Sequence, residues 1–487
     1  MNAPSETLFF QSETPFIQLS QPFVEKVTTQ PLPQPYWITW NSRLAQSLHL
    51  SLTPTHQWLN VCAGHIDQAW CSVYSGHQFG VWAGQLGDGR AHLLGSVQGA
   101  QGHPLEIQIK GAGLTPFSRM GDGRAVLRSS IREYLASEAM AALHIPTTRA
   151  LALVGSNLTV RRERLETAAV LTRLAPSFIR FGHLEHFAHR GRMAELVKLL
   201  DFVIQHHYPQ VLDSDTPYID LFEQIVSHTA RLMAQWQAVG FCHGVMNTDN
   251  MSVLGITLDY GPFGFLDHFD WQHRCNHTDQ QGRYAYDQQP QAGYWNCAAL
   301  ASAFWPLIAD ENLLADRLER FHERYQWSYL QLFRKKLGLR QEQKDDATLI
   351  KDLLDSLHAH QVDFTLFFRL LSDLTLARPE LDSSLFAPLN RSISLFNLWL
   401  ARYRQRLHQE ESIDHLRQPQ MKRTNPRFIL RNYLAQQAIE QSMEGDFTMV
   451  KELKSVLDTP FDEHPEHEDW AALPPSWASE ISVSCSS

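Results

Sequence analysis

The chain has 487 residues, enough for two or three lobes, and its 44% hydrophobic and 19% charged residues suit a soluble globular protein. A net charge of −10 provides no general basic field, which argues against a general nucleic-acid-binding role. No uncharged apolar run approaches the roughly 18 residues of a membrane helix, and no signal-peptide pattern opens the chain. The six cysteines form no CxxC pair, so we expect a reducing, cytoplasmic compartment.

Composition divides the chain into four segments. Residues 1–60 hold scattered prolines and little periodicity, and we expect them to form an extended N-terminal arm over the body. Residues 61–175 are rich in glycine and short strand patterns, whereas residues 176–410 are mainly helical in pattern. Residues 411–487 form a C-terminal extension with helices and an acidic, proline-rich end. The pattern therefore predicts an α+β fold.

The first informative element is the alternating run from Leu105 to Lys110. It predicts a half-buried strand that carries Lys110 on its polar face, at its end. Residues 126–143 follow with an apolar stripe at helical spacing and predict a helix. Gly-rich segments at 84–90 and 121–124 flank the strand, and each ends in arginine. Backbone amides of such loops can cradle phosphates, although most Gly-Asp-Gly runs are plain turns.

A second group of elements lies in the helical part. Residues 221–239 predict an amphipathic helix that Gly240 ends. A polar loop at 243–250 follows, and residues 251–258 predict two short strands before Asp259-Tyr260-Gly261. The order of these predicted elements is that of protein kinases: Gly-rich loops, a strand ending in lysine, a helix, a polar loop, a hairpin and an aspartate.

Two side chains around this hairpin predict a metal site. Asn250 and Asp259 supply the oxygen ligands that Mg²⁺ prefers. His243 and Asn250 have the spacing of the kinase pattern H-R-D-x-x-x-x-N, whose Asn binds metal, and Asp259 takes the place of the D-F-G aspartate. Alone, Asn250 could be a cap and Asp259 a turn residue. Their joint occurrence at this spacing favours function.

One position departs from the kinase pattern. Val245 occupies the place of the catalytic aspartate, and its side chain cannot accept a proton. Asp249, next to Asn250, is the nearest replacement carboxylate. Phosphorylation of a hydroxyl by the ordinary kinase mechanism is therefore in doubt.

The strand lysine and the following helix suggest an ion pair. Glu133 lies 23 residues after Lys110, and such a Lys-Glu pair positions the lysine on phosphate in kinases. A solvated Lys110 and a capping box between Ser130 and Glu133 are the structural alternatives. More arginines follow than a kinase needs, namely Arg128, Arg132, Arg173 and Arg180. This surplus suggests a triphosphate handled differently, and a solvated basic face is the alternative for Arg128 and Arg132.

With these residues in view, the sequence closely resembles the SelO (selenoprotein O) family of pseudokinases. The resemblance covers almost the whole chain, including its Cys-containing end. Four long stretches carry it: YSGHQFGVWAGQLGDGR from Tyr74 to Arg90, KGAGLTPFSRMGDGRAVLRSSIREYLASEAM from Lys110 to Met140, IPTTRAL from Ile145 to Leu151, and HGVMNTDNMSVLGITLDYGPFGFLD from His243 to Asp267.

The resemblance implies a protein-kinase-like two-lobed fold and protein adenylylation. Such enzymes bind ATP in a flipped orientation and transfer AMP to Ser, Thr or Tyr hydroxyls of target proteins, releasing pyrophosphate. By this likeness Asn250 and Asp259 hold Mg²⁺ or Mn²⁺, Asp249 accepts the proton, and Glu133 pairs with Lys110. The implied nucleotide-binding residues are Gly87, Gly89, Arg90, Lys110, Asp122, Gly123, Arg173, Arg180 and Asp259.

Three alternatives for the reaction stay open. Some family members are described as using UTP with manganese, so uridylylation is one. A conventional protein kinase is the second, and a nucleotide-binding scaffold without catalysis, suggested by Val245, is the third. The expected partners are ATP and hydroxyl-bearing proteins, with neither nucleic acid nor membrane, and a monomer is the working expectation.

Cys485, third from the end, suggests a redox function. Its alternatives are an incidental thiol or a redox switch in which oxidation tethers the tail to the body. Cys275 is the preferred partner, since histidines flank it and could favour its thiolate. A thiol redox protein acting through Cys485 alone lacks a nearby resolving cysteine in sequence.

Overall fold

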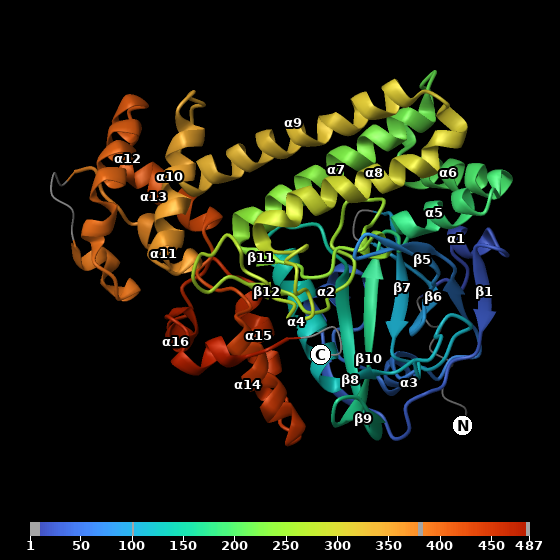
Figure 1. Ribbon diagram of the computed structural model, residues 1–487. Coiled ribbons are helices and arrows are strands. Elements are labelled where there is room, and N and C mark those ends of the chain that lie inside the picture. The colour runs from blue at the N-terminus through green and yellow to red at the C-terminus, as the bar shows by residue number, and fades with distance from the viewer. Residues whose placement is uncertain (1–9, 100–101, 378–382, 484–487) are drawn as a thin grey trace.

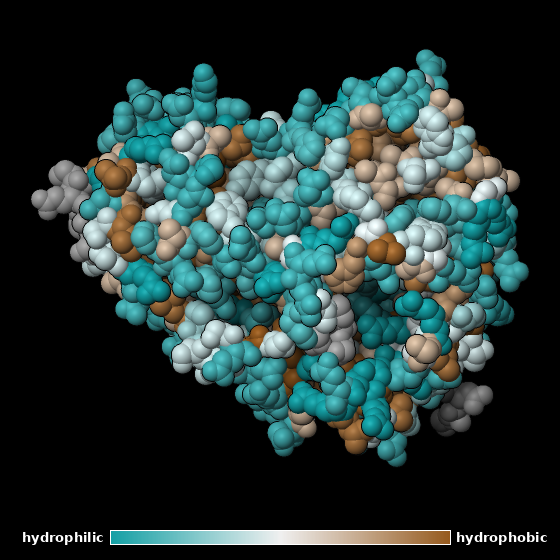
Figure 2. All heavy atoms as spheres, viewed as in Figure 1, coloured by the Kyte–Doolittle hydropathy of each residue, from teal (hydrophilic) through white to brown (hydrophobic). Residues whose placement is uncertain are grey.

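The computed structural model describes residues 10–99, 102–377 and 383–483. A strand-rich part lies below a set of long helices, and a smaller helical module projects to one side (Figure 1). The face seen in Figure 2 is mostly hydrophilic, with hydrophobic side chains in small scattered groups. In the described ranges, no helix is both long enough and apolar enough to cross a membrane.

An antiparallel sheet forms the strand-rich part. Its strand order is β1-β3-β6-β7-β10-β9-β2, and β8 pairs with β10. The strands are β1 (Val24–Val27), β2 (Tyr36–Trp40), β3 (Ala69–Ser72), β6 (Ala91–Gln98), β7 (Pro104–Lys110), β8 (Ala125–Val126), β9 (Arg149–Arg161) and β10 (Leu165–Ala175). Two-stranded pairs are formed by β4 (Ser75–Gln78) with β5 (Val81–Gln85) and by β11 (Phe241–Cys242) with β12 (Gly264–Phe265).

The expected N-terminal arm is built into this sheet. Strand β1 forms one edge beside β3, and β2 forms the other edge beside β9. Ile38 of β2 is fully buried, as Thr39 almost is. Short helices lie between and after these strands: α1 (Pro15–Gln18), α2 (Ser42–Ser47) and α3 (His56–Cys62). The sequence did not predict β1 and β2 for two reasons. Prolines interrupt the strand pattern around them, and their partner strands are far away in sequence.

Strand β7 lies inside the sheet and is buried on both faces. The prediction of a half-buried strand is therefore wrong, although the strand itself and its end at Lys110 are confirmed; it begins one residue earlier, at Pro104. Gln108 is 1% exposed and Lys110 is 8% exposed. Helix α4 (Leu127–Ala142) and the side chain of Arg173 cover the polar face, so its polar atoms bond to protein groups instead of water.

The central helices include the predicted amphipathic one. Helix α7 (Pro217–Val239) ends at Gly240 in the left-handed conformation, with φ of 71°, as its sequence predicts. Helices α7, α8 (Gln289–Ile308) and α9 (Glu311–Lys336) pack side by side above the sheet (Figure 1). Next to them lie α5 (Phe181–His189) and α6 (Met193–His207), with short 3₁₀ turns at η1 (Pro209–Val211), η2 (Thr248–Asn250) and η3 (Tyr286–Gln288).

The projecting module has its own hydrophobic core. This second core is distinct from the main one and includes Phe333, Leu353, Phe368 and Leu400. Its elements are α10 (Asp346–Ala359), α11 (Phe364–Leu371), η4 (Ser383–Leu389), η5 (Ile393–Phe396), α12 (Asn397–Gln409) and α13 (Asp414–Thr424).

The end of the chain returns to the strand-rich part. Helices α14 and α15 pack against α4, whereas α13 belongs with the second core, so the expected extension at 411–487 divides between two neighbours. The returning elements are α14 (Asn432–Met443), α15 (Thr448–Leu457), η6 (Pro465–His467), α16 (Glu468–Ala471) and η7 (Ser476–Glu480).

Residues 251–258 differ from the prediction of two short strands. One antiparallel bridge, Met251 to Thr257, closes a turn at Gly255, whose φ is +64°. The segment instead pairs with distant residues, because Thr148 donates its amide to the carbonyl of Thr257 at 3.0 Å. These pairings still bring the polar loop and Asp259 together.

Candidate functional site

The predicted site residues surround one cavity between the sheet and the loop that follows α7. The cavity has a volume of about 620 Å³. Glu133 is the member of the predicted set, apart from the cysteines, that does not line it. The lining includes Gly87, Gly89, Arg90, Lys110, Asp122, Gly123, Arg173, Arg180, Asp249, Asn250 and Asp259.

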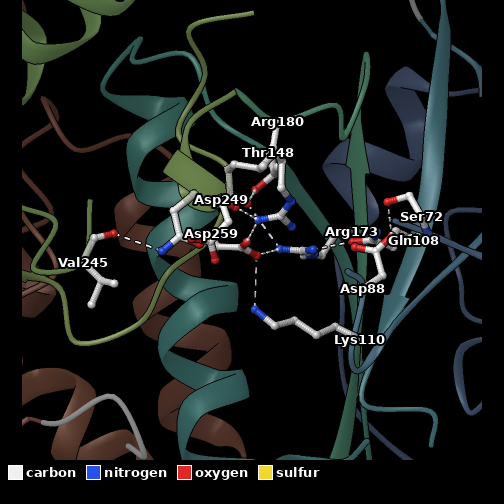
Figure 3. A network of polar contacts seen from close by, with 12 residues as sticks. Ser72, Asp88, Gln108, Lys110, Thr148, Arg173, Arg180, Val245, Asp249 and Asp259 are labelled. Carbon is white, nitrogen blue, oxygen red and sulfur yellow. Dashed lines mark hydrogen bonds and ion pairs between the residues drawn. The ribbon is translucent and has the colours of Figure 1, made fainter. Parts of the chain in front are cut away.

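Asp259 lies at the centre of a cluster of cations (Figure 3). Its carboxylate binds Arg173 and Arg180 by short ion pairs and lies 3.3 Å from Lys110 Nζ. Burial alone would raise the pKa of Asp259, but Arg180, Lys110 and Arg173 hold that pKa well below its ordinary value. Asp259 is therefore a permanent anion.

Glu133 anchors the same cations from α4. Its carboxylate binds Lys110 Nζ at 2.7 Å and Arg173 Nη1 at 2.9 Å. The capping-box alternative is excluded, because α4 begins at Leu127 and Ser130 lies buried inside the helix. Lys110 is not the solvated lysine of the other alternative either. Burial lowers its pKa, and the two nearby carboxylates oppose that shift.

The polar loop is fixed by its own backbone. Asn250 donates from Nδ2 to the carbonyl of Val245 at 3.0 Å, which leaves its amide oxygen for another ligand. His243 donates from Nε2 to the carbonyl of Asp259 at 3.0 Å. Burial lowers the pKa of His243 to about 4, so this imidazole is neutral. Val245 thus contributes its carbonyl to the site, where a kinase contributes a side chain.

Asp249 is a carboxyl group with one unsatisfied oxygen. Gln78 donates to its Oδ2 at 3.2 Å, whereas Oδ1 is buried without a hydrogen-bond partner. Burial raises the pKa of Asp249 to about 6, and the nearby Arg180 limits that rise. Arg180 also donates to the Asp249 carbonyl at 2.7 Å. A carboxylate with this pKa can take a proton near neutral pH.

The oxygen donors fit a magnesium ion that phosphates help to hold. Among the residues that the structure describes, no three His, Cys, Asp or Glu side chains cluster as ligands. Mg²⁺ commonly uses one or two carboxylates or amides together with substrate phosphates and water. Asn250 and Asp259 offer such oxygens at the cavity wall, where those of Asp259 are bound to Lys110, Arg173 and Arg180.

Glycines let the loops approach the cavity closely. Gly87 has φ of +143°, and a Cβ there would lie 2.4 Å from the ring of Phe117. Gly123 has φ of +69°, and a Cβ there would lie 2.1 Å from the carbonyl carbon of Gly113. No larger residue fits either position without moving the loop.

The charged residues of these loops differ in their partners. Arg90 is exposed and lines the cavity, where it can meet phosphate. Asp122 instead pairs with Arg162 at 2.7 Å and accepts the Arg124 amide at 2.9 Å, so it holds the loop.

The two other arginines of the predicted surplus do not form a solvated basic face. Arg128 pairs with Glu166 at 2.8 Å, and Arg132 is buried and donates to the carbonyl of Phe263 at 2.6 Å. Both arginines therefore support packing of α4 beside the cavity.

Sequence reasoning missed a hydrogen-bond chain behind the cavity. Ser72 donates from Oγ to Asp88 at 2.6 Å, and His183 Nε2 lies 3.0 Å from the same Oγ. His183 accepts the amide of Arg180 at Nδ1, at 2.9 Å. The chain links the glycine loop to the residue that binds Asp259. The position of Asp88 within Gly87-Asp88-Gly89 could have marked it as a functional residue. No motif in the sequence marks Ser72 or Gln78 in that way.

The cysteine prediction is partly wrong. Cys275 is buried, and its Sγ lies 3.2 Å from Cys242 Sγ. Burial raises the pKa of Cys275 well above its ordinary value, so its neighbouring histidines do not favour a thiolate. Cys485 lies outside the described residues. Val483, near it in sequence, accepts from His277 Nδ1 at 2.9 Å.

Comparisons with known proteins agree along the chain. The family model described as "Protein adenylyltransferase SelO" matches residues 6–458. A protein of Burkholderia vietnamiensis named "Protein nucleotidyltransferase YdiU" is 48% identical, over 99% of this chain and 96% of its own length. A protein of the same name from Burkholderia ambifaria is 49% identical, over 97% of this chain and 95% of its own length. Another from Cupriavidus metallidurans is 50% identical, over 96% of this chain and 90% of its own length.

Proposed function

The chain belongs to the SelO family of protein adenylyltransferases and is a protein nucleotidyltransferase, and on that premise we propose the reaction that its cavity performs. It transfers AMP from ATP to Ser, Thr or Tyr hydroxyls of target proteins and releases pyrophosphate. The observation that carries this proposal is the meeting of Lys110, Arg180 and Asp259 with the unsatisfied carboxyl of Asp249 in one cavity.

The proposed architecture is a protein-kinase-like pair of lobes. Residues 61–175 form the strand-rich lobe and residues 176–410 the helical lobe, extended by residues 1–60 and 411–487. The ion pair of Lys110 with Glu133, and the position of Asp259 after the polar loop, support this assignment. The proposed active form is a monomer in the cytoplasm. Measuring its molar mass in solution tests the proposed monomeric state.

The triphosphate lies between the glycine loops and the cation cluster. Backbone amides near Gly87, Gly89 and Gly123 approach it, and Arg90 and Lys110 face it from the strand-rich lobe. Arg173 is fully buried, so it orients Asp259 while adding positive charge to the site. Asn250 and Asp259 would hold Mg²⁺ or Mn²⁺, and the bound cation would offset the negative charge of phosphate oxygens.

Transfer proceeds by in-line attack at the α-phosphorus. The acceptor oxygen forms a bond to that phosphorus as the bond to the bridging oxygen of pyrophosphate breaks. The hydroxyl proton passes to Oδ1 of Asp249, the atom without a partner in the protein. Lys110 and Arg180 offset the charge on the leaving pyrophosphate.

Labelled ATP tests this reaction. Protein that is incubated with Mg²⁺ and ATP should retain label from the α position and none from the γ position. Label retained from γ instead would identify a kinase, and retention of neither would favour the catalytically inactive scaffold. Intact-mass measurement with ATP or UTP, each with Mg²⁺ or Mn²⁺, separates adenylylation from uridylylation.

A redox function of the tail is a second, separate proposal. Oxidation joins Cys485 to Cys275, whose buried thiol must first become exposed, with the two thiol protons and two electrons passing to a peroxide. The contact of Val483 with His277, two residues after Cys275, supports it. Mass spectrometry of non-reduced peptides after peroxide treatment tests the pairing, and an unmodified Cys485 would contradict it.

A further inference from the structure

A second cavity of about 710 Å³ lies next to the catalytic loop. Phe79, Arg283 and Trp295 are among its lining residues. The turn between β4 and β5 reaches both this cavity and the proposed nucleotide site, because Gln78 lines that site and Phe79 lines this cavity.

Direct hydrogen bonds connect the two cavities. Gln78 donates its side-chain amide to Asp249 Oδ2 at 3.2 Å. The next residue, Phe79, donates its backbone amide to Asn247 Oδ1 at 3.0 Å, and the hydroxyl of Tyr284 donates to the same oxygen at 2.8 Å. A polypeptide in the second cavity would therefore lie beside the carboxyl group that accepts the proton.

Arg283 gives this cavity a positive charge without a matching anion. Its guanidinium lies over the ring of Trp295, 4.7 Å from the centroid, and 5.8 Å from the centroid of Tyr284. Over residues 10–99, 102–377 and 383–483, no carboxylate forms an ion pair with it, and its Nε is buried without a hydrogen-bond partner. Aromatic rings orient the cation but do not neutralise it.

The nearest carboxylate of the same loop is already occupied. Asp279 is buried, and its two oxygens accept the backbone amides of Arg283 and Tyr284 at 3.0 and 2.7 Å. It therefore fixes the course of the loop and, within the described part of the chain, forms no ion pair with the guanidinium. By contrast, Arg173 and Arg180 in the nucleotide site both bind Asp259.

We propose that this second cavity docks the target polypeptide and that Arg283 binds an acidic side chain near its acceptor hydroxyl. The inference rests on the proposed function and adds a substrate class to it. Charge decides the occupant, since an arginine held in a hollow without an anion favours a carboxylate. Side-chain amides of Gln288 and Gln291 on the rim can bond the backbone of an extended chain.

Matched peptides test this proposal. Alanine-based peptides would carry one central tyrosine, serine or threonine and, at each flanking position in turn, glutamate, glutamine or lysine. With α-labelled ATP and Mg²⁺, the wild-type protein should prefer the best glutamate peptide to its glutamine twin by roughly threefold to tenfold, through KM. Arg283→Gln should label both twins equally, and Arg283→Glu should prefer the lysine peptide.

The controls separate folding and chemistry from recognition. The melting temperature of Arg283→Gln and its affinity for ATP should match those of the wild type, which shows that the variant is folded and binds nucleotide. Equal labelling of glutamate and glutamine peptides by the wild type would overturn this inference alone, as would self-labelling without any peptide labelling. Absence of α-label on every peptide and on the protein itself would overturn the proposed function and the inference with it.

Discussion

At the residue scale, Asp249 lies next to a cation but is poorly solvated. Arg180 is its neighbour and favours the charged carboxylate. Asp249 is nevertheless only 9% exposed and one of its oxygens has no hydrogen-bond partner, so the charged form is poorly stabilised. Burial accordingly raises its pKa to about 6. A basic carboxylate suits proton transfer, and the same feature weakens the fold around it.

The first prediction concerns pH and rate. Transfer should fall as the pH drops through about 6, because Asp249 must be deprotonated to accept a proton. Asp249→Asn should lower kcat by roughly 10²- to 10⁴-fold while ATP still binds. Pyrophosphate release measured from pH 5 to 9 checks both. An unchanged pH profile in the residual activity of Asp249→Asn would assign the proton to another group.

The second prediction concerns stability at the same residue. The folded-state pKa of Asp249 lies above its unfolded value, so the protonated group stabilises the fold below about pH 4, and this stability is lost as the pH rises through about 6. Asp249→Asn should therefore increase the free energy of unfolding by roughly 1–3 kcal/mol at pH 8. Thermal melts at pH 8 and pH 4 should show the gain only at pH 8.

The third prediction concerns Asp259. Asp259→Asn keeps the shape and removes the charge that Lys110, Arg173 and Arg180 share. Transfer should fall on the order of 10²-fold or more, and its dependence on Mg²⁺ concentration should weaken. Activity of wild-type size in this variant would refute the assignment of Asp259 as a metal ligand.

At the element scale, helices and strands were predicted correctly where the hydrophobic pattern within a single segment determines them. Helices α4 and α7 follow from apolar stripes, and the last residue of β7 follows from its alternation. The burial of both faces of β7 could not be foreseen, because Arg173 and Glu133 cover its polar face from elsewhere in the sequence. The 251–258 segment failed as a hairpin for the same reason, since it pairs with Thr148.

The site followed a similar rule. Motif spacing placed Asn250 and Asp259 near each other, and both line the cavity. Gln78 and Ser72 were missed because their contacts, with Asp249 and Asp88, join separate segments. Hydrophobic periodicity carries no information about such pairs.

The fourth prediction uses two glycines with matched backbones. Gly123 and Gly84 have φ of +69° and +70°, but a Cβ on Gly84 would meet nothing within 4 Å. Both alanine variants bear the cost of a left-handed alanine, about 1–2 kcal/mol. Gly123→Ala must also displace its loop, so its KM for ATP should rise roughly tenfold to hundredfold, whereas that of Gly84→Ala should stay near wild type. Equal KM values would show that loop position does not matter for ATP.

At the scale of the whole molecule, α9 links two cores. Phe321 lies in the main core, whereas Phe333 near the other end of the helix lies in the second core. Lys336, its last residue, is buried with its Nζ 4.3 Å from the Phe368 ring centroid. Burial lowers the pKa of Lys336 to about 7.

The fifth prediction concerns this lysine. Its folded-state pKa lies below the unfolded value of 10.5, so the lysine destabilises the fold in full below about pH 7 and progressively less as the pH rises from 7 to 10.5. Lys336→Met, of similar volume, should add roughly 2–5 kcal/mol to the free energy of unfolding near pH 6. Denaturant titrations should show this gain shrinking as the pH rises towards 10.5. A constant gain would mean that packing, not charge, is responsible.

The return of α14 and α15 to α4 has a consequence for synthesis on the ribosome. Arg132 on α4 donates to Asn432 at 3.3 Å, and the next residue, Glu133, binds Lys110 of the cation cluster. A nascent chain that ends before residue 432 already contains all the nucleotide-site residues, yet it lacks the helices that pack on α4. The helix that carries Glu133 therefore gains its full packing support only when the last segment of the chain emerges.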